Sequence, residues 1–157
     1  IGWCDWSSDV CSSDLISTKG RYALKAVFEL AIADKNTPLP LSMISEKSGL
    51  SELYLEQIFS VLKKNNIVKS IRGAQGGYFL TKDIKEISVG EVIKPLEGDL
   101  SPAKCVEEDG YCDMLDRCPT YMIWDNIKKA IDDVVDNTTL SDMVDEYYKK
   151  HKLKSRD

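Results

Sequence analysis

Residues 41–80 constrain the fold of this chain most strongly, because two short helical patterns and two short strand patterns follow one another there. Gly49 is expected to end a helix at 41–48 in the left-handed conformation that glycine adopts without strain. Ser51 is a suitable N-cap for a second helix at 52–65, because its hydroxyl can accept a hydrogen bond from a free amide of the first turn. Two helices joined by so short a turn predict a helix-turn-helix.

The helix expected at 52–65 has two chemically different faces. Apolar residues recur on one side at helical spacing and are expected in the core: Leu55, Ile58, Phe59 and Leu62. The opposite side suits a DNA major groove, where an amide can bond a base edge, an apolar group can meet a thymine methyl and an ammonium can reach phosphate. These candidates for DNA contact are Leu53, Gln57, Ser60 and Lys64. The alternative is a solvated face with one exposed leucine.

A β-hairpin is expected directly after these helices. Residues 67–71 and 78–80 are typical of short strands, and the loop 72–77 between them contains three glycines. Arg72 and Gln75 in this loop are further candidates for DNA contact, and an arginine is favoured electrostatically in a minor groove. A phosphate-binding glycine loop is the competing interpretation, but no helix start with Lys-Ser/Thr follows the glycines. The order of elements therefore predicts a winged helix-turn-helix.

The charge distribution agrees with contact to DNA through one end only. The formal net charge of the chain is −5. Residues 16–80 nevertheless hold nine Lys/Arg and five Asp/Glu, a net of +4, whereas residues 81–148 hold seven and seventeen, a net of −10. A basic head on an acidic body favours phosphate contacts at the head, although a chance fluctuation over short windows is the alternative.

Cys105, Cys112 and Cys118 lie within fourteen residues of polar sequence. Thiolates this close can share a metal or a cluster, because the loops between them close at little entropic cost. The chain has no recognisable export signal, and in a reduced cytoplasm clustered cysteines bind metal more often than they form disulfides. Three alternatives stay open: a structural zinc site, a metal-free thiol redox switch, and an electron-transfer iron–sulfur protein. An enzyme is not expected, because no nucleophile–base pair or acidic dyad stands in a recognisable setting.

Two helices are expected after the cysteine loop. Cys118 and Pro119 are expected to begin the first, with the proline in its first turn, and Thr138 or Thr139 caps the second. The first helix carries an apolar seam of Ile123, Ile127, Ala130, Ile131 and Val134. Because this seam has more apolar surface than a small winged helix covers, we expect a two-fold homodimer that reads a pseudo-palindromic operator. The alternative is that the seam folds back on its own winged helix.

The expected organisation follows from these segments. Residues 1–15 have no helical or strand periodicity and resemble a translated adapter or fusion scar, so we expect them to be disordered. No apolar run approaches the roughly 20 residues of a membrane span, which favours a cytoplasmic protein without membrane contact. The fold class is mainly α with a small β-hairpin wing and a long C-terminal dimerisation helix. The segments are 1–15 (scar), 16–98 (winged-helix DNA-binding domain), 99–118 (cysteine cluster-binding loop), 119–148 (dimerisation helices) and 149–157 (charged tail).

Several motifs together resemble the IscR-type family of bacterial winged-helix regulators, which includes the iron–sulfur assembly regulator, NsrR and CymR. The motifs are residues 16–23 (ISTKGRYA), 53–60 (LYLEQIFS), 70–78 (SIRGAQGGY) and 89–93 (VGEVI). The resemblance extends from Ile16 to about Tyr148. It implies a homodimeric repressor or dual regulator of transcription. In cluster-binding members, an iron–sulfur cluster changes DNA affinity or site choice in response to iron–sulfur status, oxygen or nitric oxide.

The resemblance also implies residue roles. Tyr54, Gln57 and Arg72 match DNA-contacting positions, as does Leu53, where the assembly regulator carries Ser. Glu56 matches a residue that restricts which sites the cluster-free protein accepts. The three loop cysteines match the ligands of a cluster, for which 2Fe–2S is favoured over 4Fe–4S. The fourth ligand is a departure, because Tyr121 stands where the assembly regulator has His.

Overall fold

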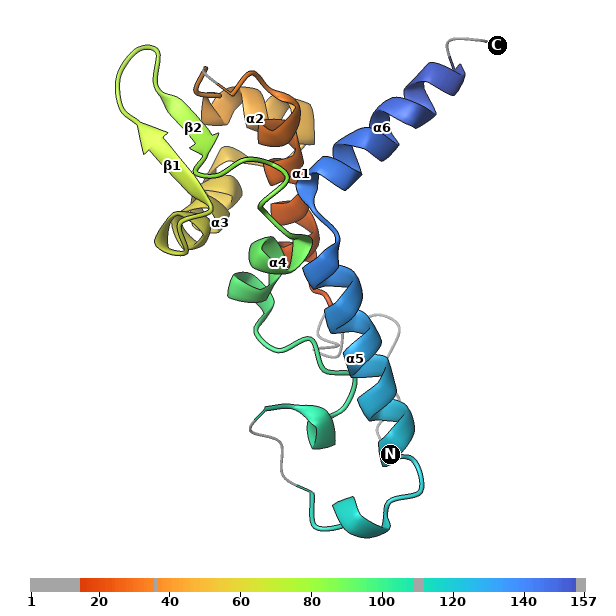
Figure 1. Cartoon of the computed structure of the whole chain (residues 1–157). Coiled ribbons are helices and arrows are strands. Elements are labelled where there is room, and N and C mark those ends of the chain that lie inside the picture. Colours follow the sequence, from red (N-terminus) through yellow and green to blue (C-terminus); the bar gives the residue numbers. More distant parts are fainter. Residues whose placement is uncertain (1–14, 36, 109–111, 155–157) are drawn as a thin grey trace, which may run out of the picture.

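The computed structural model describes residues 15–35, 37–108 and 112–154. The expected scar at 1–15 lies outside this part except for Leu15, and so do residues 155–157 of the expected tail. The described residues form six α-helices, two 3₁₀ turns and one two-stranded antiparallel hairpin (Figure 1). In chain order these are α1 (Thr18–Ile32), α2 (Leu41–Ser48), α3 (Glu52–Lys64), β1 (Val68–Ile71), β2 (Gly77–Leu80), α4 (Val89–Glu97), η1 (Lys104–Val106), η2 (Leu115–Arg117), α5 (Tyr121–Asn137) and α6 (Leu140–Lys154).

The helix starts and stops follow the capping residues of the sequence. The side chains of Ser17 and Ser51 accept hydrogen bonds from first-turn amides of α1 and α3. Ser88 and Glu91 form the reciprocal capping box of α4, with Ser88 Oγ accepting from Glu91 N at 3.1 Å. Gly49 ends α2 at φ 73°, in the left-handed region. The expected helix-turn-helix is therefore confirmed, with α3 ending at Lys64, one residue before the expected end at 65.

The hairpin is held against the helical part of the fold. Val68 pairs with Leu80 and Ile71 with Gly77, so the tip spans residues 72–76. An isolated bridge joins Tyr78 to Leu39, with each amide donating to the other carbonyl at 2.9 Å. Thr81 Oγ1 donates to the carbonyl of Asn66, which closes the base of the hairpin. The hairpin is thus fixed at its base while its tip is exposed, as a wing requires.

One apolar core joins the helix-turn-helix, the hairpin and the start of α6. The fully buried side chains of α3 are those expected from the sequence, and they meet residues of α1, α2 and β1. Leu140, the first residue of α6, is also fully buried in this core. Its buried members are Ala23, Ala26, Val27, Leu30, Leu39, Ile44, Leu55, Ile58, Phe59, Leu62, Ile67, Val68, Ile87, Val92 and Leu140. The winged-helix fold is confirmed, and the last helix completes it.

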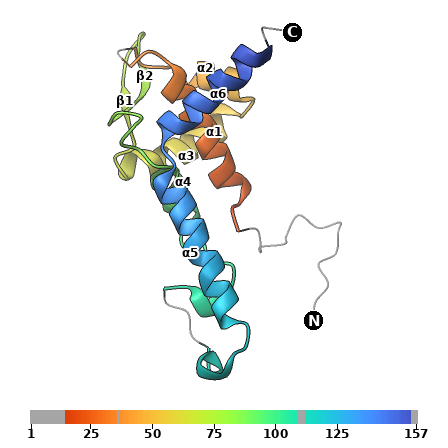
Figure 2. The ribbon, with the colours of Figure 1, turned by 45° about the vertical axis from the view of Figure 1, so that its right-hand side comes forward.

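Helix α5 projects away from the winged helix and carries the cysteine loop at its far end, as both views show (Figures 1 and 2). A second apolar cluster of Ile93, Leu100 and Val135 joins α4, the start of the loop and α5. The junction between α5 and α6 is bound to the segment before α4. Val89 N donates to Thr138 O at 2.8 Å and Leu140 N donates to Ile87 O at 3.0 Å. The base of α5 is therefore fixed to the winged helix.

Two helix ends differ from the sequence prediction. Helix α5 begins at Tyr121, after Pro119 rather than at it. Cys118 is extended, with ψ 115°, because a residue before proline avoids the helical region. Helix α6 continues to Lys154, well beyond the expected end at Tyr148. Lysines near a helix C-terminus stabilise the helix because their positive charge interacts favourably with the negative end of the helix dipole. In addition, Lys150 Nζ pairs with Glu146, one turn earlier, at 3.4 Å.

The apolar seam of α5 is divided between two faces. Ile131 packs against the second apolar cluster. Val135, which was not included in the expected seam, is a buried member of that cluster. Ile123, Ala130 and Val134 lie on the other side of the helix and are exposed, with 63% of Val134 accessible. Neighbouring apolar residues at helical spacing can face two directions, because the stripe is wider than one contact. Part of the seam thus folds back on its own winged helix and loop, while the rest stays uncovered within the described chain.

Candidate functional site: the reading surface and the cysteine loop

Helix α3 presents the polar face that the sequence predicted for DNA. Leu53 is 70% exposed, although its neighbour Leu55 is fully buried. The other predicted residues of this face, Glu56, Gln57, Ser60 and Lys64, are also exposed. Neither the side chain of Gln57 nor that of Lys64 makes a hydrogen bond or ion pair within the described part of the chain. An amide, an ammonium and an aliphatic group are therefore displayed together on one rigid helix.

Tyr54 differs from the rest of this surface because it is half-buried. Its ring packs edge-on against Tyr22 of α1, with 5.8 Å between ring centroids. Burial, and then the nearby Tyr22 and Glu97, raise the pKa of the Tyr54 hydroxyl above 10.0. The hydroxyl is therefore neutral at physiological pH and can donate as well as accept a hydrogen bond. Tyr54 also ties the first turn of α3 to α1.

The wing, which is the hairpin of β1 and β2 with its tip at residues 72–76, continues the polar surface of α3. Arg72, Gly73 and Gln75 are exposed at its tip, and Gly73 has φ 120°, a conformation that favours glycine. Lys63 Nζ, on the last turn of α3, donates to Ser70 Oγ of β1 at 2.7 Å. Arg72 makes no hydrogen bond or ion pair within the described residues. An arginine held on a fixed hairpin, with no side-chain partner among the described residues, is available for an external anion or base edge.

Glu97 connects the end of α4 to the start of α1. Its carboxylate accepts hydrogen bonds from Ser17 N at 3.0 Å, Ser17 Oγ at 2.6 Å and Gly20 N at 2.7 Å. Burial raises the pKa of this carboxyl, but the hydrogen bonds from Ser17 and Gly20 lower it further, to a value below 4.5. A negative charge at a helix N-terminus is favourable because the free amides there carry partial positive charge. Glu97 is thus an anionic cap supplied by another helix.

The first half of the cysteine loop is packed on the protein. Leu100 is fully buried and Val106, beside Cys105, is buried as well. Asp99 Oδ2 accepts hydrogen bonds from Ser101 Oγ at 2.7 Å and from Glu108 N at 3.1 Å. These contacts fix both ends of residues 99–108.

The second half of the loop is more open. Residues 113–117 are exposed, and they include Met114 and Leu115. Cys118 Sγ lies 3.3 Å from Thr120 Oγ1. Hydrogen bonds from the side chain and backbone of Thr120 lower the pKa of the Cys118 thiol below 9.0, and a hydrogen bond from the Tyr121 backbone adds to this effect. Burial raises the pKa, but by less. A lowered pKa increases the thiolate fraction, which is the form that binds metal or reacts.

The three loop cysteines suit a metal or cluster by chemistry but are not gathered by this structure. Cys105, Cys112 and Cys118 are free thiols, and each is half-buried. Among the described residues, no three Cys, His, Asp or Glu side chains are grouped closely enough to hold a metal ion. Tyr121, at the position expected for a fourth ligand, is the half-buried first residue of α5. The donor set therefore fits an iron–sulfur cluster, whereas the arrangement of the sulfurs does not.

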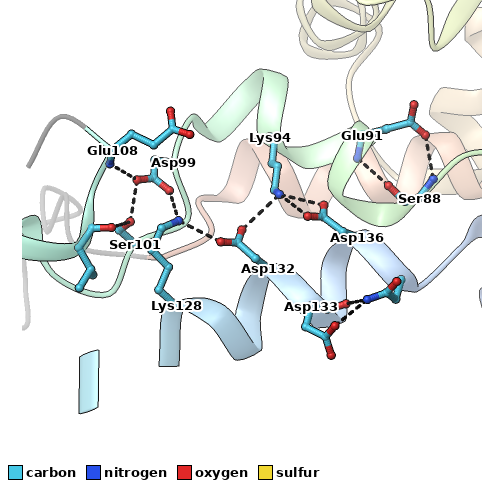
Figure 3. Close-up of polar contacts among 12 residues, drawn as sticks. Ser88, Glu91, Lys94, Asp99, Ser101, Glu108, Lys128, Asp132, Asp133 and Asp136 are labelled. Atoms are coloured by element: carbon cyan, nitrogen blue, oxygen red, sulfur yellow. Dashed lines mark hydrogen bonds and ion pairs between the residues drawn. The ribbon is translucent and has the colours of Figure 1, made fainter. Parts of the chain in front are cut away.

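A chain of ion pairs, which the sequence reasoning missed, connects the loop to α5 and α4 (Figure 3). Lys128 Nζ lies 2.6 Å from Asp99 and 3.0 Å from Asp132. Lys94 Nζ lies 3.2 Å from Asp132 and 2.8 Å from Asp136. We call Asp99, Lys128, Asp132, Lys94 and Asp136 the α4–α5–loop ion-pair chain. Only the spacing of Lys128 and Asp132, four residues apart on one helix, could have indicated part of it from the sequence.

No helix in the described part of the chain is long and apolar enough to cross a membrane.

Comparison with known proteins agrees with this architecture. Residues 16–146 match the Rrf2 family model, which is described as an iron-dependent transcriptional regulator. The HTH-type transcriptional regulator IscR of Serratia proteamaculans (strain 568) is 41% identical over 129 residues, or 82% of this chain and 78% of that protein.

Two solved structures are similar to this chain in both fold and sequence. CymR (YrzC), the global cysteine regulator of B. subtilis, matches with a TM-score of 0.71 and 42% identity over 83% of this chain and 96% of that one. IscR of T. potens matches with a TM-score of 0.69 and 42% identity, over 84% of this chain and 87% of that one. The family match covers most of the chain and includes both the winged helix and the cysteine loop. This chain belongs to the Rrf2 family of winged-helix transcriptional regulators, which are not enzymes.

Proposed function

We propose that this protein is a homodimeric repressor or dual regulator whose promoter binding is controlled by an iron–sulfur cluster on Cys105, Cys112 and Cys118. The observation that carries the proposal is the presence on one chain of an exposed α3 and wing surface and, at the far end of α5, a loop with three free thiols. The likeness to IscR proteins, and the iron-dependent description of the family, support the choice of an iron–sulfur group. The expected site of action is the bacterial cytoplasm, where promoter DNA lies.

The DNA-contacting residues in this proposal are those displayed by α3 and the wing. Gln57 and Arg72 read base edges or a narrow groove, and Lys64 contacts phosphate. Leu53 supplies an apolar contact such as a thymine methyl would accept. Tyr54, Glu56, Ser60 and Gln75 complete the surface. Electrostatic attraction of Lys and Arg to phosphate makes the affinity fall with rising salt concentration.

The uncovered side of α5 supports the proposed homodimer. Ile123, Ala130 and Val134 form an exposed apolar stripe along a helix that projects from the winged helix. Burial of such a stripe against the same stripe of a second copy gives a two-fold symmetric contact. Two reading surfaces related by that axis suit a pseudo-palindromic operator.

The cluster would be held by the three loop thiolates, with 2Fe–2S favoured over 4Fe–4S. When bound, it supplies a group that oxygen, nitric oxide or iron shortage can remove or alter. With three protein thiolates, the fourth iron position is open to a phenolate such as that of Tyr121, to a loop carboxylate, to water or to a small thiol.

The test is an anaerobic purification followed by iron and acid-labile sulfide analysis and a visible absorption spectrum. The wild-type protein is expected to show visible bands, and Cys112→Ser is expected to lose them while staying folded. Cys11→Ser, which removes a thiol outside the loop, is the matched control and should keep the bands. Wild-type protein without iron, sulfide or visible bands would contradict the proposal.

A metal-free thiol switch is the second candidate, and two observations favour it. The three sulfurs are not gathered for a metal in this structure, and the Cys118 thiol has a lowered pKa because Thr120 donates to it and burial opposes this only partly. Thiol counting before and after mild oxidation distinguishes the two functions. Loss of two thiols as a loop disulfide, with no iron, would support the switch. Zinc in the metal analysis, without visible bands, would instead indicate a zinc site.

A further inference from the structure

The α4–α5–loop ion-pair chain is placed between the two parts of the molecule that the proposed function must couple. Asp99 lies on the cysteine loop, Lys128 and Asp132 lie on α5, and Lys94 lies on α4 of the winged helix (Figure 3). Charges of opposite sign alternate along the chain, so each lysine bridges two carboxylates. A change at the loop can therefore reach α4 through direct contacts.

We propose that Lys128 is a positioning residue that transmits the state of the cysteine loop to the winged helix by sharing its ammonium between Asp99 and Asp132. The inference rests on the proposed function, because it requires that the loop changes state. It assigns the coupling to a named side chain that lies outside both the proposed DNA-contacting surface and the three cysteines.

The environment of Lys128 makes this contact stronger than an ordinary surface ion pair. The Lys128 side chain is only 18% exposed, whereas that of the neighbouring Lys129 is 72% exposed. Partial exclusion of water lowers the local dielectric constant and reduces screening by salt. Burial lowers the pKa of Lys128, but its hydrogen bonds to Asp99 and Asp132 raise the pKa further, to above 10.5. The ammonium is thus fully charged and held between the loop and α5.

Competition for Asp132 gives the physical basis of the transmission. Asp132 accepts from Lys128 and from Lys94, and Lys94 also binds Asp136 at 2.8 Å. If the loop moves and withdraws Asp99, Lys128 is left with Asp132 as its anionic partner. Lys94 then shifts towards Asp136, which lies one turn further along α5. The orientation of α4 against α5 depends on which of these carboxylates Lys94 binds.

A movement of α4 reaches the reading surface through contacts of its last residue. Glu97 caps the N-terminus of α1 at Ser17 and Gly20. Two residues beyond Gly20, Tyr22 packs on Tyr54 of α3. The apolar cluster of Ile93, Leu100 and Val135 also holds α4, the start of the loop and α5 together. Apolar contacts are non-directional, so this cluster alone permits a small rotation of α4 against α5. The ion pairs fix that rotation.

The experiment measures the dissociation constant for one promoter duplex with cluster-loaded and with stripped protein, at fixed salt. In Lys128→Met, the ratio of these two constants is expected to move towards 1 by about two- to thirty-fold, the range of mutations that alter coupling. Lys128→Arg keeps the charge and should restore most of the ratio. Lys129→Met is the matched control, because Lys129 pairs with Asp125 on the same helix and makes no ion pair with the described residues of the loop.

A second measurement does not need the cluster. In stripped protein, amide hydrogen exchange of residues 99–108 and 89–97 should become faster in Lys128→Met than in Lys129→Met. Asp99→Asn breaks the same contact from the loop side and should act like Lys128→Met, which covers the case that one variant folds poorly.

The outcomes separate this inference from the function on which it rests. Equal affinities of the loaded and stripped wild-type protein would overturn the proposed function. A wild-type difference that is unchanged in both Lys128→Met and Asp99→Asn would overturn this inference alone. Unchanged hydrogen exchange in α4 and the loop of the stripped variants would also overturn it.

Discussion

Replacement of Gly20 by alanine is a test in which two physical effects have opposite signs. In an ordinary helix the change stabilises by about 1 kcal/mol, because alanine loses less backbone entropy than glycine. Here a Cβ on Gly20 would overlap the side chain of Glu97, whose Cγ would lie at 2.9 Å. The flexible Glu97 side chain can move away, so the energetic cost of the substitution is the loss of the hydrogen bonds that Glu97 accepts.

The size of that penalty decides the sign. Glu97 accepts three hydrogen bonds from Ser17 and Gly20. At about 1 kcal/mol each, the value for an ordinary hydrogen bond and below that for a desolvated charged acceptor because Glu97 is partly solvated, their loss costs about 3 kcal/mol. After subtraction of the gain in helix propensity, Gly20→Ala should lower the free energy of unfolding by about 2 kcal/mol.

Urea denaturation of stripped protein, followed by far-ultraviolet circular dichroism at fixed protein concentration, measures this difference. In a Glu97→Ala background the same substitution should stabilise, because no carboxylate remains to be displaced. Since the pKa of Glu97 is lowered on folding, its contribution is present above 4.5 and is lost as the pH falls through the folded value. The penalty of Gly20→Ala should therefore shrink in acid. A variant more stable than wild type at pH 7 would refute the reasoning.

Three further substitutions test the core, the wing and the dimer. Leu140→Ala should lower the free energy of unfolding by about 2–5 kcal/mol, because it leaves a cavity in the core shared by α6 and the winged helix; a loss typical of a surface residue would contradict the packing of α6. Arg72→Ala should weaken promoter binding by about 1–3 kcal/mol without changing stability, and an unchanged dissociation constant in a binding titration would argue against the wing contact. Val134→Lys should shift sedimentation from dimer to monomer by placing charge in the proposed interface; an unchanged dimer would place the interface elsewhere.

The fold was largely predictable because its signals are local. Ser17, Ser51 and Ser88 cap helices, and Gly49 ends one, through contacts within a few residues. The hairpin followed from a glycine-rich loop between two β-prone runs. The start of α5 was placed too early because proline suits a first helical turn, yet here Pro119 instead holds Cys118 in an extended conformation.

Contacts between distant residues set the limit of prediction for the site. Asp99 and Lys128 are 29 positions apart in the sequence, and Lys94 and Asp136 are 42 positions apart. Nothing in the local sequence around these residues indicates that they form ion pairs. The exposure of Leu53 and Gln57 followed from helical periodicity alone. The division of the α5 seam did not, because periodicity identifies an apolar stripe without saying which of its sides meets α4 and which remains uncovered.

The central claim is that the group held by the loop cysteines changes how the winged helix binds its promoter. The most direct measurement takes one anaerobic preparation, removes the cluster from half of it with a chelator, and determines the promoter dissociation constant of both halves at the same salt concentration. The two dissociation constants are expected to differ by about 5- to 150-fold, the usual range of a coupling between two sites. Equal dissociation constants, with iron and sulfide present in one half and absent from the other, would contradict it.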